Sequence, residues 1–196
     1  MIAVALAGVA LGGTWTMSGA VGHDFSVAEP WAGVALARHP GQGAPVQGIG
    51  QLAPAWGFAE GAPYLLGEIG VLARIPEDEA VVRVGVIGAA TGLSGGSEAP
   101  IALGGGLGIS PGLMGALEFE WGDRAPLTFS ARGGVGSALY DTCETDEETG
   151  CYHWTAAFVG GFGLRYRSPG GLSLEGRLGP SSDLRIGWAF GGRVEP

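Results

Sequence analysis

The chain has 196 residues, a formal net charge of −9 and a mean hydropathy of +0.28. Only 15% of its residues are charged and 40 are glycine, whereas a soluble domain usually carries about 25% charged residues and about 7% glycine. The acidic balance argues against a nucleic-acid partner, which needs a basic patch, and glycine has no period of three, which excludes a collagen-like chain. Apolar residues come in short runs broken by Gly, Ser and Thr, which favours many strands in one domain.

The first 24 residues allow several interpretations. Residues 1–22 carry no charge, and the apolar run 2–11 followed by Ser18-Gly19-Ala20 is typical of a signal peptide with a cleavage site. Residues 14–24 also alternate like a strand, so 3–24 could form a first hairpin. A transmembrane helix is a third alternative by length. We therefore separate an N-terminal segment, 1–24, from the main domain, 25–196.

From residue 30 onward the sequence alternates with period two, which is typical of strands separated by turns. Ten strands are expected, at residues 31–38, 46–59, 64–74, 80–90, 101–110, 113–121, 126–138, 153–167, 172–178 and 184–193. Turns are expected at 39–41, 76–79, 110–112, 122–124, 168–171 and 179–182. Pro54 should bend its strand or place it at an edge. Eight or twelve strands are alternatives, twelve if residues 3–24 add a hairpin.

The two faces of these strands differ in composition. One face is apolar, and the other combines Gly, Ala and Ser with charges of both signs. A soluble sandwich would instead expose a face rich in Lys, Glu and Thr, so we interpret the apolar face as facing lipid and the other as facing a narrow lumen. The charges expected inside are Glu68, Arg74, Arg83, Glu118, Glu120, Arg132, Arg165, Arg167, Glu175, Arg177, Arg185 and Arg193. The aromatic residues expected at the membrane interfaces are Trp121, Tyr140, Tyr152, Trp154, Tyr166 and Trp188.

The only two cysteines, Cys143 and Cys151, flank an acidic segment. In an oxidising compartment such a pair predicts a disulfide, which would contribute roughly 2.5 kcal/mol for so short a loop. A zinc site is disfavoured, because His153 is the only histidine nearby. The acidic side chains are expected to be solvated at a loop tip, with binding of Ca²⁺ or another cation as the alternative. They are Asp141, Glu144, Asp146, Glu147 and Glu148.

From about residue 30 the chain resembles the bacterial outer-membrane β-barrel proteins, particularly their small members. The resemblance lies in the alternation and in the last strand, 184–190, which looks like the C-terminal assembly signal of that family. The chain departs from the family by continuing through residues 191–196. The resemblance implies an all-β, antiparallel up-and-down transmembrane barrel in the outer membrane of a Gram-negative bacterium. Its implied partners are membrane lipid and the barrel-assembly machinery, with no cofactor and no metal.

Hairpin loops of such a barrel alternate between its two ends. With the loop between the cysteines outside, the turns at 76–79, 110–112 and 179–183 should also lie outside. The turns at 61–63, 122–125 and 168–171 should then lie inside together with the C-terminus. Segment 92–99 is long for an inner turn.

Residues for catalysis are sparse. A hydrolytic site would need His153 as base, Ser137 as nucleophile and Asp141 as orienting acid, but the alternation puts Ser137 on the lipid face. His39, next to Pro40-Gly41, is expected to be exposed in a turn. We therefore expect a protein that is not an enzyme.

The expected role is structural or at the cell surface, with an unidentified surface ligand possible, or that of a narrow pore. Eight inner arginines against four glutamates would make such a pore anion-preferring. The alternatives are an outer-membrane lipid-modifying enzyme and a soluble β-barrel that binds an apolar ligand.

Overall fold

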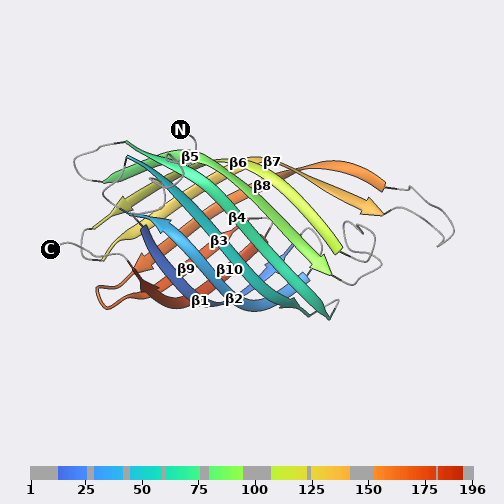
Figure 1. Cartoon of the computed structure of the whole chain (residues 1–196), viewed down its shortest axis with the longest axis horizontal. Helices are drawn as coiled ribbons and strands as arrows, with labels where there is room; N and C mark the ends of the chain where they lie inside the picture. Colours follow the sequence, from blue (N-terminus) through green and yellow to red (C-terminus); the bar gives the residue numbers. More distant parts are fainter. Residues whose placement is uncertain are drawn as a thin grey trace, which may run out of the picture.

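A computed structural model describes residues 13–25, 29–41, 45–58, 61–75, 80–94, 107–122, 125–141, 152–179 and 181–191. These residues form a closed, antiparallel, up-and-down barrel in which each strand pairs with its neighbours in sequence and β1 pairs with β10 (Figure 1). The strands are β1 (Gly13–Asp24), β2 (Glu29–Pro40), β3 (Val46–Gly57), β4 (Ala62–Ile75), β5 (Val81–Ser94), β6 (Leu107–Trp121), β7 (Leu127–Asp141), β8 (Tyr152–Arg167), β9 (Leu172–Leu178) and β10 (Ser181–Phe190). No helix of the described residues is long and apolar enough to cross a membrane.

The first strand closes the barrel. β1 pairs with β2 on one side, starting from Gly13↔Pro40, and with β10 on the other, from Trp15↔Phe190 to Asp24↔Ser181. Residues 13–24 therefore belong to the barrel, which was expected to start at residue 25. Residues 13–24 make one wall strand in place of a separate hairpin, and the cleavage site expected at 18–20 falls within it. Residues 1–12 lie outside the described residues.

One strand, β6, covers residues 107–121 in place of the separate strands expected at 101–110 and 113–121, so the turn predicted at 110–112 is wrong. Residues 101–106 lie outside the described residues. β6 runs through Pro111, which pairs with Ala90 of β5, whereas pairing with β7 starts only at Gly112↔Gly136. Proline lacks an N–H group and disrupts a ladder only where that group is needed. The strand total stays at ten because β1 replaces the lost one.

Pro54, like Pro111, pairs with only one of its two neighbouring strands. It pairs with Leu65 of β4 but lies in a gap of the β2–β3 ladder, between the pairs Gly33↔Ala55 and Leu36↔Leu52. The barrel closes around this local interruption, so the strand has no free edge. Of the two alternatives expected for Pro54, a bent strand or an edge strand, the edge strand is therefore excluded.

The strand order fixes which connections share an end of the barrel. β5 and β7 end on the same side of the barrel as β1, β3 and β9, and we call this the long-connection end because the chain continues from β5 and β7 into the longest connections, 95–106 and 142–151. The opposite, short-connection end holds the connections after β2, β4, β6 and β8 together with the C-terminal end of β10. The turn at 61–63 was predicted to lie inside and the turn at 76–79 outside. The strand order places them at the opposite ends, so both predictions are wrong. Merging two strands into β6 also moves the long segment 92–99 to the long-connection end, which removes its poor fit.

The interior contains two apolar clusters besides its charges. Near the long-connection end, Trp31 packs against small residues and Leu66, and its side chain is only 1% exposed. The second cluster covers the inner face of β3 to β6. Its buried members are Ile49, Leu72, Ile87, Met114 and Ala116.

The Trp31 ring packs against Gly22, which has no side chain. A Cβ added at Gly22 would lie 2.5 Å from the Trp31 ring, whereas one at Gly19, on the outer face of the same strand, would meet only the Ile186 carbonyl at 4.0 Å. We expect Gly22→Val to destabilise the barrel by about 1–3 kcal/mol through overpacking. Urea unfolding of the detergent-refolded protein measures this. Gly19→Val is the matched control, and an equal loss in both variants would contradict the packing argument.

Candidate functional site

The charged residues predicted inside the barrel lie on its inner face wherever the structure describes them. Arg193 lies outside the described residues. A further inner charge, Asp183, was not predicted; it is buried on the inner face of β10 two positions before Arg185. The predicted strand began at residue 184, and extending the same alternation backwards would have included Asp183. With it, the described interior divides into two clusters of opposite character.

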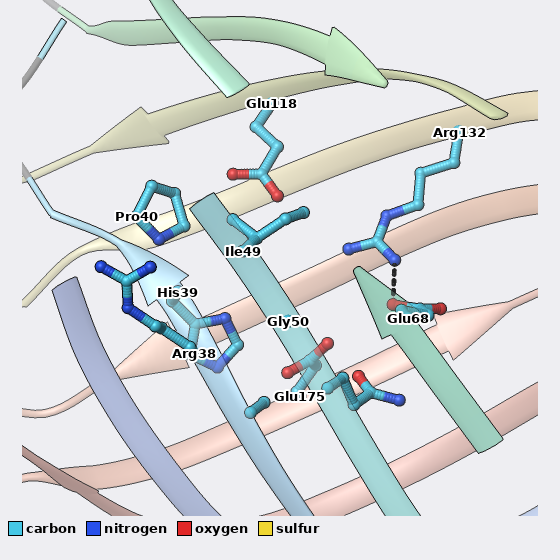
Figure 2. Close-up of a pocket in the computed structure, with 11 residues that line it drawn as sticks. Arg38, His39, Pro40, Ile49, Gly50, Glu68, Glu118, Arg132 and Glu175 are labelled. Carbon is cyan, nitrogen blue, oxygen red and sulfur yellow. Dashed lines mark hydrogen bonds and ion pairs between the residues drawn. The ribbon is translucent and has the colours of Figure 1, made fainter. Parts of the chain in front are cut away.

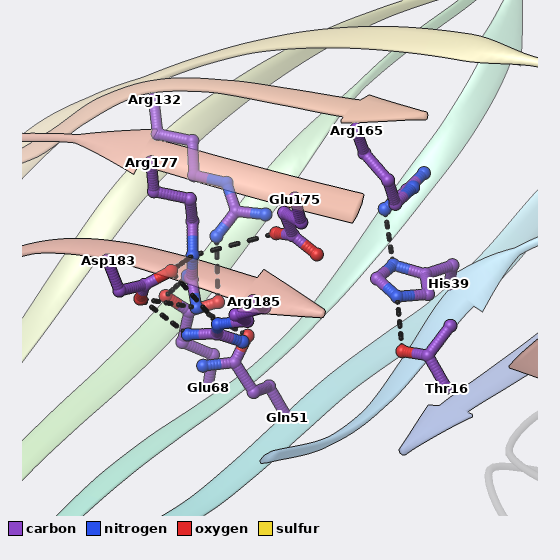
Figure 3. Close-up of polar contacts among 10 residues, drawn as sticks. All are labelled: Thr16, His39, Gln51, Glu68, Arg132, Arg165, Glu175, Arg177, Asp183 and Arg185. Atoms are coloured by element: carbon purple, nitrogen blue, oxygen red, sulfur yellow. Dashed lines mark hydrogen bonds and ion pairs between the residues drawn. The ribbon is translucent and has the colours of Figure 1, made fainter. Parts of the chain in front are cut away.

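The central cluster is balanced in charge (Figure 3). Arg177 of β9 lies at its centre, with Nη1 2.9 Å from Glu68 Oε1, Nη2 3.3 Å from Asp183 Oδ2 and Nε 3.6 Å from Glu175 Oε1. These partners come from three strands, so the cluster ties opposite walls of the barrel together. Its six charged members are Glu68, Arg132, Glu175, Arg177, Asp183 and Arg185.

Further contacts extend this network. Arg132 Nη1 lies 2.7 Å from Glu68 Oε2, Arg185 Nη2 lies 2.6 Å from Asp183 Oδ2, and Arg177 donates to Gln51 Oε1 at 2.7 Å. Charge-assisted hydrogen bonds of this length are among the stronger polar contacts in proteins. The cluster therefore fills the centre of the barrel with ordered, mutually paired groups.

The mouth cluster lies at the short-connection end. Arg83, itself 2% exposed, has Nη1 3.9 Å from Glu118 Oε2 and Nη2 3.4 Å from Glu120 Oε1. Arg83 Nη2 also donates to the carbonyl of Gly41 in the β2–β3 connection, which Gln47 Nε2 bonds as well. The six charged members are Arg74, Arg83, Glu118, Glu120, Arg165 and Arg167.

His39 is buried, contrary to the expectation of an exposed turn residue. It continues the inner row of Ala35 and Ala37 in β2, with 9% of its surface exposed, and its ring lies between Thr16 and Arg165 (Figure 3). Guanidinium groups only donate, so Nδ1 accepts from Arg165 and the proton lies on Nε2, which donates to Thr16 Oγ1 across 2.9 Å. A nitrogen that carries a proton cannot act as base for that hydroxyl, so this arrangement does not form an activated nucleophile.

A small cavity separates the two clusters (Figure 2). It measures about 20 Å³, and its polar lining includes His39, Gln51, Glu118 and Arg132. Three buried atoms among these residues, Gln51 Nε2, Glu118 Oε2 and Arg132 Nε, have no hydrogen-bond partner among the described residues. The volume and the mixture of donors and acceptors fit a single ordered water molecule. No group of three or more metal-ligating side chains occurs in the described part of the chain.

The structure does not describe the side chains of the predicted cysteines, acidic loop residues and candidate catalytic residues. Cys143, Cys151, Glu144, Asp146, Glu147 and Glu148 lie outside the described residues, so the disulfide and the acidic loop stay predictions. Ser137 and Asp141 in β7 and His153 in β8 have described backbones, but their side chains are not described. The same holds for Tyr140, Tyr152 and Trp154 of the aromatic set.

The three predicted interfacial aromatic residues whose side chains are described lie on the outer face. Trp121, Tyr166 and Trp188 are 44%, 37% and 58% exposed and lie toward the short-connection end of their strands. Trp15 and Phe190, which pair in the β1–β10 ladder, belong to the same band and were missed. An amphipathic ring at a strand end is the arrangement that an aromatic girdle requires.

Searches of this chain against models of protein families, curated proteins and solved structures gave no match.

Proposed function

We propose that this chain is an integral β-barrel protein of the outer membrane of a Gram-negative bacterium, with a structural or cell-surface role. The observation that carries the proposal is the outer face of the barrel. Ile69 is 75% exposed, Leu178 71% and Val135 70%, and they lie on β4, β9 and β7, so the exposed apolar surface is present on both sides of the barrel. A closed barrel leaves no strand edge unpaired, which is the condition for β-structure in lipid.

The apolar surface is too large for a monomer in water. Aromatic side chains have roughly 150–250 Å² of surface each, and Phe158, Phe162 and Trp188 are each more than half exposed. Together with the aliphatic side chains between them, they exceed the few hundred Å² of the largest apolar patch on a typical soluble protein. Because apolar side chains occur on the outer face of every strand with described side chains, lipid is the covering that accounts for all of them.

The interior favours a closed barrel over a pore. The central cluster pairs its charges in place, and the Trp31 cluster adds an apolar layer toward the long-connection end. An ion would have to displace both. The surface role would then belong to the two long connections, 95–106 and 142–151, which leave the barrel at the same end. As a member of this class, the chain would require the barrel-assembly machinery for insertion.

The first test uses the full chain extracted from membranes with detergent. We expect the unheated sample to migrate differently from the heated sample on a cold SDS gel, because a closed barrel in which every strand is paired resists SDS until it is heated. A protein that stays soluble without detergent and migrates identically in both lanes would overturn the membrane assignment and favour the soluble, ligand-binding barrel.

The same preparation distinguishes a closed barrel from the narrow anion-preferring pore. In planar bilayers we expect the wild-type protein to show no stepwise conductance. Stepwise currents with anion preference would replace the structural role by the pore.

A further inference from the structure

The charges inside the barrel are not balanced along its axis. In the central cluster three arginines face three carboxylates, Glu68, Glu175 and Asp183. In the mouth cluster four arginines face only Glu118 and Glu120 among the described residues. The positive surplus of the described interior therefore lies entirely at the short-connection end.

Two arginines of the mouth cluster, Arg165 and Arg167, contact neutral side chains. Both project inward from β8, two positions apart, so their Cα atoms are roughly 7 Å from one another. Arg165 bonds to His39 and donates to Thr128 Oγ1 at 3.3 Å, and Arg167 donates to Thr14 Oγ1 at 2.8 Å. All of these partners are neutral. Among the described residues, no carboxylate lies within ion-pair distance of either guanidinium.

The nearest carboxylates are already engaged. Glu118 and Glu120 both face Arg83, and Glu120 Oε2 also accepts from Thr128 at 3.3 Å. Arg165 and Arg167 remain partly exposed, whereas Arg83, Glu118 and Glu120 are buried. Arg165 and Arg167, which have no ion pair among the described residues, are thus more exposed than the three ion-paired members of the mouth cluster.

An unpaired cation at a partly buried position costs free energy, which an anion in contact with it recovers. Guanidinium groups present planar pairs of N–H donors that match phosphate oxygens, and two of them side by side can bind one phosphate from two directions. The apolar wall separates this inner surface from the outer face, so a lipid head group does not reach it.

We propose that Arg165 and Arg167 form a binding site for a phosphate group of a small solute at the short-connection end of the barrel. The solute enters from the aqueous phase on that side. The central cluster and the Trp31 layer lie beyond the site, so the ligand binds without crossing. This inference does not depend on the membrane assignment, because the same two side chains would face the lumen of a soluble barrel.

The test uses the full-length protein in detergent micelles, titrated with inorganic phosphate at constant ionic strength against chloride. We expect saturable binding by calorimetry and a rise in the unfolding midpoint with phosphate concentration, because a ligand of the folded state stabilises it. Arg167→Gln should raise the phosphate dissociation constant at least tenfold, and Arg167→Lys, which keeps the charge but loses the fork, should raise it less.

Arg38→Gln is the matched control. Arg38 follows the outer row of β2, where it pairs with Trp15 and Gly50, and its Nη1 donates to the Gly48 carbonyl at 2.8 Å. The Arg38→Gln change therefore removes the same charge at the same end and leaves the contacts of Arg165 and Arg167 with His39, Thr128 and Thr14 in place. The phosphate dissociation constant of the Arg38→Gln variant should equal that of the wild type. The proposal is overturned if phosphate acts no differently from chloride, or if Arg38→Gln weakens binding as much as Arg167→Gln. The first outcome would mean that the surplus charge is neutralised within the chain.

Discussion

Replacing Ile69 with arginine is expected to destabilise the barrel by about 2–4 kcal/mol in a lipid bilayer, the cost of an arginine on the lipid face at mid-depth. Ile69 lies in the middle of β4 on the outer face and is 75% exposed. An arginine side chain at that point would lie in the hydrocarbon core of the bilayer, away from water and lipid head groups. The measurement is the urea midpoint of the protein folded into phospholipid vesicles.

The matched control places the same charge at a different depth. Val46, the first residue of β3, is on the outer face at the short-connection end and 44% exposed. Val46→Arg should cost only about 0–1 kcal/mol, because the arginine reaches the interface. In a soluble barrel both positions would be wet and both changes would stay within about 0.5 kcal/mol. Equal, small effects would therefore remove the membrane assignment.

Arg177→Leu is expected to cost about 3–5 kcal/mol, the usual effect of removing one partner from a buried ion-pair network. Arg177 contacts all three carboxylates of the cluster, Glu68, Glu175 and Asp183. Glu68 and Asp183 also contact Arg132 and Arg185, whereas Glu175 has no other ion-pair partner among the described residues. Its removal leaves that carboxylate charged and unpaired in the lumen. Urea unfolding in detergent measures the loss.

A second substitution separates the charge effect from lost packing. Adding Glu175→Gln to Arg177→Leu should recover part of the stability, since it removes the carboxylate left unpaired. The difference between the single and double variants gives the coupling between the two positions, expected at about 0.5–3 kcal/mol. A loss below about 1 kcal/mol in Arg177→Leu, or no recovery in the double variant, would show that the lumen is hydrated enough to screen the network.

Alternation along each strand was readable because a strand side chain has only two directions. Leu117 and Glu118 could be assigned to opposite faces before any fold was known, and so could Ile186 and Arg185. The same rule would have placed His39 and Asp183 inside, had the strand limits been set one or two residues further out. Strand limits were the weak point because proline and glycine were interpreted as turns.

The turn predicted at Pro111 caused the largest error in the predicted topology. Whether a missing N–H interrupts a ladder depends on the neighbouring strand, and β7 does not pair there. That one error assigned the connections after β3, β4 and β5 to the wrong ends of the barrel. The alternation within each strand stayed correct, since a strand's faces do not depend on which strand lies beside it.

The class of fold, the apolar outer face and the charged inner face could be predicted, because these properties follow from local alternation and composition. The pairing of the charges could not be predicted, because it depends on which strands lie opposite one another in the closed barrel. Glu68 meets Arg132 and Arg177 across distances of 64 and 109 residues along the chain, and Arg165 meets His39 across 126. Such partners are set by the closure of β1 on β10 and by the register of every ladder between them. The balanced centre and the positive mouth arise from that closure, which no local pattern contains.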